Sequence, residues 1–170
     1  MPKINFNHLS NLEISAIFSE DKKYRYLLTI VNKSCIKGDT LCIIMQNPSI
    51  ANIEIADKSV QFLEKLVFEK KVRPFKKIQK MVIVNQFALV QTKDFSGTKK
   101  AIGVQNDIII QESIEKADYV LIAWGKTNPY YERQEAIHDF LEDMDCKKIF
   151  TTKKHPSRGT YQDFIISYSF

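Results

Sequence analysis

Residues 41–49, with the sequence LCIIMQNPS, contain the pattern from which the fold of this chain can be inferred. The apolar run over residues 41–45 does not alternate with polar residues. Such a run is typical of a strand that is buried on both faces of a parallel sheet. Polar and turn-forming residues follow it at once, from Gln46 to Ser49. The stretch therefore predicts a buried strand whose carboxyl end carries polar side chains.

Two later segments show the same pattern, the predicted strands at residues 81–85 (MVIVN) and 119–124 (YVLIAW). A further strand is predicted at residues 148–151 (KIFT). A fifth predicted strand precedes them all at residues 24–31 (YRYLLTIV), which is rich in β-branched and aromatic residues. The strands at residues 81–85, 119–124 and 148–151 end, like the strand at residues 41–45, in polar or turn-forming residues.

Segments with helical periodicity separate these strands. Helices are predicted at residues 58–71 and about 105–116, and a third from Asn128–Pro129, where asparagine can cap a helix and proline can begin it. Alternating strands and helices predict an α/β fold. We expect one domain over residues 1–170, a three-layer sandwich with a central four-stranded, mainly parallel sheet.

Composition narrows the classes of function. The 170 residues include 25 Lys and Arg against 20 Asp and Glu, so the net charge is +5, which permits a polyanionic partner without demonstrating one. Neither a GxGxxG nor a Walker-type loop is present, and the three cysteines lack metal-type spacing. We therefore expect no cofactor and no metal. Cys42 and Trp124, which belong to apolar strands, are expected in the core.

The cysteine spacing described above, together with hydropathy, also indicates the cellular compartment. No apolar run approaches the roughly 18 residues that are needed to span a bilayer. The first residues, MPKINFNHLS, lack the continuous apolar segment of a signal peptide. A cytoplasmic protein without a membrane partner is the expectation.

The candidate site residues lie at the carboxyl ends of the predicted strands. In open parallel sheets, ligands bind at the carboxyl ends of the strands, so these ends should converge on one cleft. Asn47 can orient a water molecule, and the amide of Asn85 can pair with the edge of a nucleobase. His155 can donate a hydrogen bond to a developing oxyanion. Each residue also has a structural explanation, as a turn before proline, a loop cap and a loop corner, respectively.

Taken in order, the strand ends resemble a known group of enzymes. The series MQNPS, VIVNQFAL, VLIAWGK and KKHPSRG is similar to the uracil-DNA glycosylase superfamily. Over roughly residues 24–160 the chain also resembles a bacterial family of uncharacterised domains with NPS, NxFAL, AWG and HPS signatures, often carried on mobile elements. The resemblance implies a uracil-DNA-glycosylase-like fold, DNA as partner and a role in base excision repair.

The same resemblance implies a role for each matching residue. Asn47 would position the attacking water, and His155 would stabilise charge on O2 of a base that has been flipped out of the helix. Asn85 would read the Watson–Crick edge of this base. The remaining base-binding candidates are Gln46 and Phe87, with Phe87 or Phe62 as the stacking residue. The hydrolysis would be monofunctional and would need no metal.

Further positions would face the DNA backbone or the gap that the base leaves. Ser49 and Ser157 would approach phosphates. Ser49 stands where the most uracil-selective branch has a bulky tyrosine that excludes a 5-methyl group, so strict selection of uracil is not expected. Arg158 or Tyr161 would take the place of the usual apolar wedge.

Two basic clusters are candidates for phosphate contacts. The first is the stretch 65–80, which includes Lys76 and Lys77 and in which Phe75 is available to stack on a base. A solvated helix face and loop would explain this stretch equally well. The second cluster lies beside the HPS motif and is favoured for direct contact. It consists of Lys153, Lys154 and Arg158, with Lys126 at the end of the preceding strand.

Three functions remain open at this point. The chain can be a DNA glycosylase, or a non-catalytic nucleic-acid-binding module of a mobile element that has kept the cleft but lost turnover. It can also be an enzyme or sensor for free nucleosides or nucleotides, in which case the basic clusters serve solubility alone.

Overall fold

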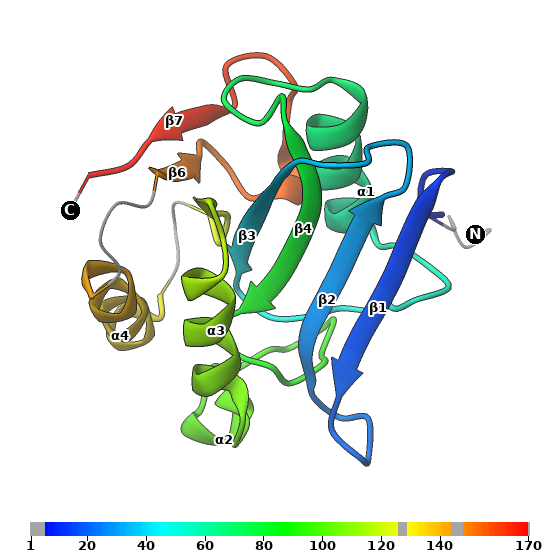
Figure 1. Cartoon of the computed structure of the whole chain (residues 1–170). Helices are drawn as coiled ribbons and strands as arrows, with labels where there is room; N and C mark the ends of the chain where they lie inside the picture. Colours follow the sequence, from blue (N-terminus) through cyan, green and yellow to red (C-terminus); the bar gives the residue numbers. More distant parts are fainter. Residues whose placement is uncertain (1–5, 126–128, 144–147, 170) are drawn as a thin grey trace.

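A mixed β-sheet forms the centre of the molecule (Figure 1). The computed structural model describes residues 6–125, 129–143 and 148–169. Within them the sheet has seven strands in the order β1-β2-β4-β3-β5-β6-β7. The strands are β1 (Leu12–Phe18), β2 (Arg25–Asn32), β3 (Asp39–Met45), β4 (Ile78–Asn85), β5 (Tyr119–Ile122), β6 (Lys148–Thr152) and β7 (Ile165–Ser167).

The sheet is larger than the sequence predicts. Strands β4, β3, β5 and β6 pair in parallel, whereas β1–β2, β2–β4 and β6–β7 pair antiparallel. The α/β class is confirmed, and the prediction of a sheet of four strands is corrected to a mixed sheet of seven. Strand β1 was missed although its sequence LEISAIF alternates between partly buried and exposed residues, as an edge strand does. Strand β7 has only three residues, too few for a period to be visible.

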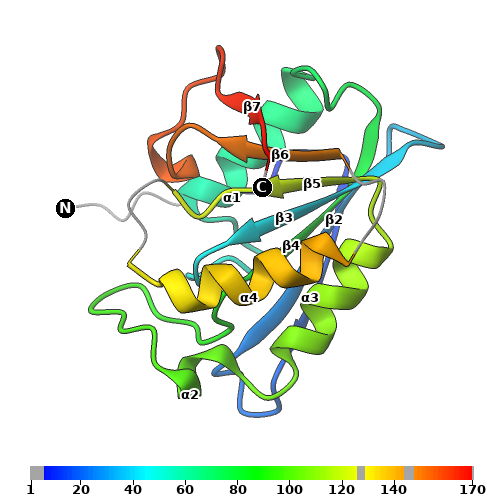
Figure 2. The same ribbon diagram turned by 90° about the vertical axis from the view of Figure 1, so that its left-hand side faces the viewer.

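Helices lie on both faces of the sheet (Figure 2). Helix α1 (Lys58–Glu64) continues into a π-helical turn, η1 (Lys65–Glu69), and covers one face together with the short 3-10 helix η2 (Pro156–Arg158). The other face carries α3 (Asn106–Glu115) and α4 (Tyr131–Glu142), with the single turn α2 (Lys99–Ile102) before them. The helix predicted to begin at Asn128–Pro129 begins at Tyr131; Asn128 lies outside the described residues.

Both faces of the central strands are buried, because successive side chains of a strand point to opposite sides. Ile43 and Ile83 pack toward α1, whereas Ile44 and Val84 pack toward α3 and α4. Cys42 is completely buried, and burial raises the pKa of its thiol to about 12. The core positions predicted for Cys42 and Trp124 are confirmed. None of the described helices is long and apolar enough to cross a membrane.

A buried charge pair connects the N-terminal segment to α1. His8 Nδ1 lies 2.5 Å from Glu64 Oε1, and His8 Nε2 lies 2.7 Å from the backbone oxygen of Asn52. Both ring nitrogens therefore face acceptors, as in a protonated imidazole. Burial lowers the pKa of His8, but the hydrogen bonds to Glu64 and Asn52 and the charge of Glu64 outweigh it and raise the pKa above 6.5.

This pair predicts a pH-dependent stability. Since the pKa of His8 is raised on folding, its stabilisation is fully present below pH 6.5 and is lost as the pH rises through the pKa of the folded state. We expect His8→Gln to lower the free energy of unfolding by about 3 kcal/mol in mild acid, because one partner of a buried pair is removed. Urea unfolding of both proteins across pH measures the difference, which should shrink toward alkaline pH. A difference that grows with pH would contradict the assignment.

Candidate functional site

A cavity of about 170 Å³ lies at the carboxyl ends of β3 and β4. It brings together four of the predicted site residues, Asn47, Ser49, Asn85 and His155, from three separate segments of the chain. The convergence expected at the strand ends is thus present for these four. The complete lining is Arg25, Met45, Asn47, Pro48, Ser49, Asp57, Ser59, Val60, Asn85, Gln91, Thr92 and His155.

The loop after β3 is fixed by the loop after β4. The backbone N–H of Phe87 donates to the carbonyl of Gln46 over 2.9 Å, and that of Gln91 donates to the carbonyl of Pro48 over 3.1 Å. Asn47 Nδ2 donates to the Gln91 carbonyl over 2.7 Å, and Asn47 Oδ1 lies 3.2 Å from Gln46 Nε2. Gln46 thus contacts Asn47 and does not line the cavity. The side chain of Asn47 is held in place, with one lone pair of Oδ1 left to accept a hydrogen bond.

Asn85 is the most unusual residue of the cavity. Its side chain is only 1% exposed, yet neither Nδ2 nor Oδ1 has a hydrogen-bond partner within the described part of the chain. A buried polar group without a partner costs about 1–3 kcal/mol. Since Asn85 lines the cavity, a ligand that offers one acceptor and one donor can satisfy both groups.

His155 is held as a hydrogen-bond donor toward its surroundings. Its Nδ1 accepts from the backbone N–H of Ser157 over 3.2 Å and lies 2.8 Å from Ser157 Oγ. Burial, and then the charge of Arg158, lower the pKa of His155, although Asp57 acts in the opposite sense. At neutral pH the imidazole is therefore uncharged and carries its proton on Nε2. This N–H can be donated to a ligand oxygen.

Two glycines explain why the loops can approach one another. Gly125, at the end of the AWG sequence, has φ +90°, a left-handed conformation that strongly favours glycine. A Cβ atom there would lie 3.4 Å from Cβ of His155. A Cβ on Gly159 would lie 2.3 Å from Cζ of Phe62 in α1, which no side chain tolerates. Gly159 therefore allows the loop that carries His155 to pack on α1.

Arg25 and Asp57 were missed by the sequence reasoning. Arg25 is 2% exposed and lies at the first position of β2, which runs antiparallel to β4, so the start of β2 meets the end of β4. Asp57 caps α1, where its Oδ1 accepts from the backbone N–H of Val60 over 2.8 Å. Neither residue follows a predicted parallel strand, so the rule of strand ends does not find them. The sequence offered one signal for Asp57: an aspartate directly before a helical pattern whose first apolar residue is Val60 is a typical N-cap.

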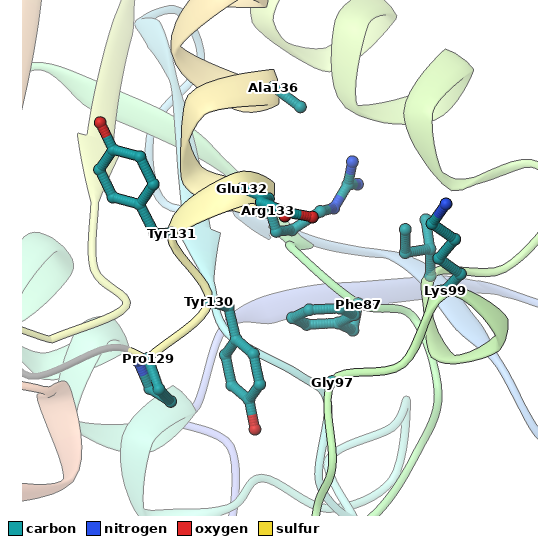
Figure 3. Close-up of a pocket in the computed structure, with 10 residues that line it drawn as sticks. Phe87, Gly97, Lys99, Pro129, Tyr130, Tyr131, Glu132, Arg133 and Ala136 are labelled. Atoms are coloured by element: carbon teal, nitrogen blue, oxygen red, sulfur yellow. The ribbon is translucent and has the colours of Figure 1, made fainter.

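Phe87 lies elsewhere than the strand-end reasoning expects. It lines a second cavity, of about 570 Å³, between α2 and the start of α4 (Figure 3). There its ring packs edge-on against Tyr130 and Phe95, with centroids 4.9 Å and 5.3 Å away. Phe87 is 2% exposed and does not line the cavity of Asn85, so the structure does not bring it there to stack on a base.

The other aromatic candidates are engaged in packing. Phe75 is completely buried in the core, so the expectation that it is available to stack on a base is wrong. Phe62 stacks on Tyr161 with a centroid distance of 5.1 Å and meets Phe164 edge-on. Tyr161 remains 37% exposed beside Phe62, with the ammonium of Lys70 above its ring.

The two basic clusters lie near opposite ends of the parallel strands, one after β6 and the other before β4. Lys153 and Lys154 are exposed and directly precede His155, and Arg158 is exposed in η2. Lys76 and Lys77 precede β4, whereas Asn85 ends it. The seven residue steps between Ile78 and Asn85 span roughly 23 Å in a strand. The structure thus does not bring Lys76 and Lys77 to the cavity, and Lys126 lies outside the described residues.

Metal binding finds no support in the described residues. They contain no group of three or more His, Cys, Asp or Glu side chains that could hold an ion. Among the described residues that line the smaller cavity, Asp57 and His155 are the only side chains of these types.

The unpaired amide of Asn85 predicts an unusual response to mutation. We expect Asn85→Leu to raise the free energy of unfolding by about 1–2 kcal/mol, because leucine has a similar shape and removes two unpaired polar groups. Asn106→Leu is the control: Oδ1 of Asn106 also has no partner in the described part of the chain, but its Nδ2 is hydrogen-bonded. Asn106 Nδ2 donates to the carbonyls of Asn85 and Gln86 over 2.9 Å and 3.2 Å, so this change should lower the free energy of unfolding by about 2 kcal/mol. Chemical denaturation measures both, and equal losses would show that Asn85 is satisfied in solution.

Comparison with known proteins gives one match. No curated protein and no solved structure matches the chain. A family model described as "Protein of unknown function (DUF1643)" matches residues 25–158, a segment that includes every residue lining the smaller cavity. Since the match covers more than half of the 170 residues, this chain belongs to the DUF1643 family.

Proposed function

We propose that this protein binds DNA and receives a single flipped base in the cavity of Asn85, as a member of the uracil-DNA glycosylase superfamily with the fold of that group. In its active form it hydrolyses the N-glycosidic bond of a damaged or modified base. One observation carries the proposal: a buried amide without partners, Asn85, lines a cavity of the size of one base.

The size of the cavity favours a single ring. Its volume of about 170 Å³ is close to that of an engineered protein cavity of about 150 Å³ that holds benzene. Pockets for drug-sized ligands start at about 300 Å³. A six-membered base therefore fits, and a sugar and phosphate attached to it would lie outside the cavity.

The lining residues supply the groups that hydrolysis needs. Asn47 Oδ1 retains a lone pair that can hold a water molecule near the sugar. The water oxygen forms a bond to C1′ while the bond from C1′ to the base nitrogen breaks, and the base takes the electron pair. His155 Nε2–H can then donate to the base oxygen on which charge develops. The water proton passes to solvent.

The basic residues beside His155 support a nucleic-acid partner. Lys153 and Lys154 are exposed and immediately precede His155, so a phosphate bound by them would lie near the cavity mouth. Ser49 lines the cavity, and Ser157 is partly exposed beside it. Because Ser49 leaves more space than a bulky aromatic residue would, the proposed substrate is not restricted to uracil.

A glycosylase assay tests the proposal. Labelled single- and double-stranded oligonucleotides with uracil, mismatched thymine or modified bases are incubated with the protein, and alkali then cleaves any abasic site. We expect strand breaks that fall at least about 100-fold in Asn47→Ala and His155→Ala, because general acid–base and oxyanion groups contribute factors of this size. DNA binding without strand breaks would contradict the glycosylase activity and support a non-catalytic nucleic-acid-binding module. Absence of binding at about 50 mM salt, where phosphate contacts are strong, would overturn both readings.

The two basic clusters can be separated by salt dependence. In Lys153→Gln/Lys154→Gln, we expect the slope of log K for duplex DNA against log salt concentration to become shallower by about 2, because each phosphate contact contributes about 0.9. Lys76→Gln/Lys77→Gln removes the same charge at the opposite end of β4 and is the matched control. Fluorescence anisotropy at several salt concentrations measures both. Equal effects would show that the net charge alone attracts DNA.

A further inference from the structure

Arg25 brings a buried positive charge into the cavity, and it forms no ion pair within the described part of the chain. Its side chain is 2% exposed, and Nη1 donates to the carbonyl of Ala51 over 2.6 Å. Nε is buried and has no partner in the described part of the chain. Burial lowers the pKa of Arg25 to about 10, so the guanidinium is still charged at neutral pH.

The acidic group of the cavity offsets part of this charge from a distance but forms no direct ion pair with it among the described residues. Asp57 lines the same cavity and acts on Arg25 electrostatically, but the ion pairs among the described residues do not include one between them. One oxygen of Asp57 is already used to cap α1. Buried charges in proteins are normally in direct contact with a partner, so a guanidinium that lines a cavity without such a contact points to a ligand of opposite charge.

The second buried arginine shows what a satisfied guanidinium looks like in this protein. Arg133 is 6% exposed, forms an ion pair with Asp107, and donates from Nε to the carbonyl of Gln86 over 2.6 Å. Arg25 forms no corresponding ion pair with a carboxylate of the described residues, although it is buried even more deeply.

We propose that the cavity is an anion site in which Arg25 binds a negatively charged oxygen of a planar ring, while Asn85 pairs with the neighbouring edge of that ring. The inference rests on the proposed base-binding cavity and names the chemical class of its ligand. In the reaction, the ring departs with the electron pair of the broken bond between C1′ and nitrogen, and Arg25 stabilises the resulting anion. Bases that carry an exocyclic oxygen next to the ring nitrogen are therefore the substrates that this site suits.

Two free rings test the charge requirement without DNA. Barbiturate is a pyrimidine ring that is anionic at neutral pH, and uracil is a similar ring that is neutral there. We expect barbiturate to bind the full-length protein at least about tenfold more tightly than uracil in titration calorimetry, because charge-assisted hydrogen bonds are roughly twice as strong as neutral ones. Equal affinities, or no binding of either ring, would overturn the inference.

Variants assign the preference to Arg25. Arg25→Gln should abolish the difference between the two rings, whereas Arg25→Lys should keep part of it. Arg133 is also a buried guanidinium, but it lines the larger cavity. The Arg133→Gln protein should therefore be less stable and still bind barbiturate more tightly than uracil. If Arg25→Gln does not fold, the comparison of the two rings in the wild-type protein still decides. A preference that persists in folded Arg25→Gln would overturn the assignment.

The outcomes separate this inference from the proposed function. Preferential binding of barbiturate by a protein that never produces strand breaks would support the anion site and contradict the glycosylase activity. Strand breaks from a protein without a preference for the anionic ring would support the glycosylase activity and contradict the anion site.

Discussion

The position of β4 between β2 and β3 is the constraint on which the candidate site depends. β4 pairs in parallel with β3, so Asn85 at its end meets the loop of Asn47. It pairs antiparallel with β2, so the first residue of β2, Arg25, arrives at the same edge. A one-residue slip of β4 would exchange the side chains that pack in the two cores, so the packing of both cores holds this register.

Several buried polar groups near this edge of the sheet lack a partner among the described residues. Other buried polar groups are paired, as in the contacts of Arg133 with Asp107 and of His8 with Glu64. Among the residues that line the cavity, both amide atoms of Asn85 and Nε of Arg25 have no partner in the described part of the chain. Both amide atoms of Gln86, Oδ1 of Asn106 and Oγ1 of Thr152 also have none there, although these residues do not line the cavity. A protein retains such groups at a cost in stability where a ligand completes them. The unsatisfied groups therefore mark the site only in combination with the cavity, which selects Asn85 and Arg25 among them.

Much of the fold could be predicted from the sequence. Continuous apolar runs predicted β3, β4 and β5, strands were also predicted at the positions of β2 and β6, and helical periodicity predicted α1 and α3. The edge strands were missed for physical reasons: β1 is half exposed, and β7 is too short to show a period. Asn47, Ser49, Asn85 and His155 were found because polar residues directly follow apolar strands. Phe75 was misjudged because the basic residues around it suggested a surface, whereas its ring fills the core.

The sequence by itself determined the α/β class, the central strands and the polar strand ends, because all of these follow from local patterns of a few residues. Only the tertiary structure decided which of the polar residues meet. Strand order, the antiparallel pairing of β2 and the close packing at Gly159 bring Arg25 and Asp57 to the cavity and leave Phe87, Lys76 and Lys77 away from it. These are pairings between distant segments, and the amino-acid pattern of one segment does not encode the position of its neighbour in the sheet.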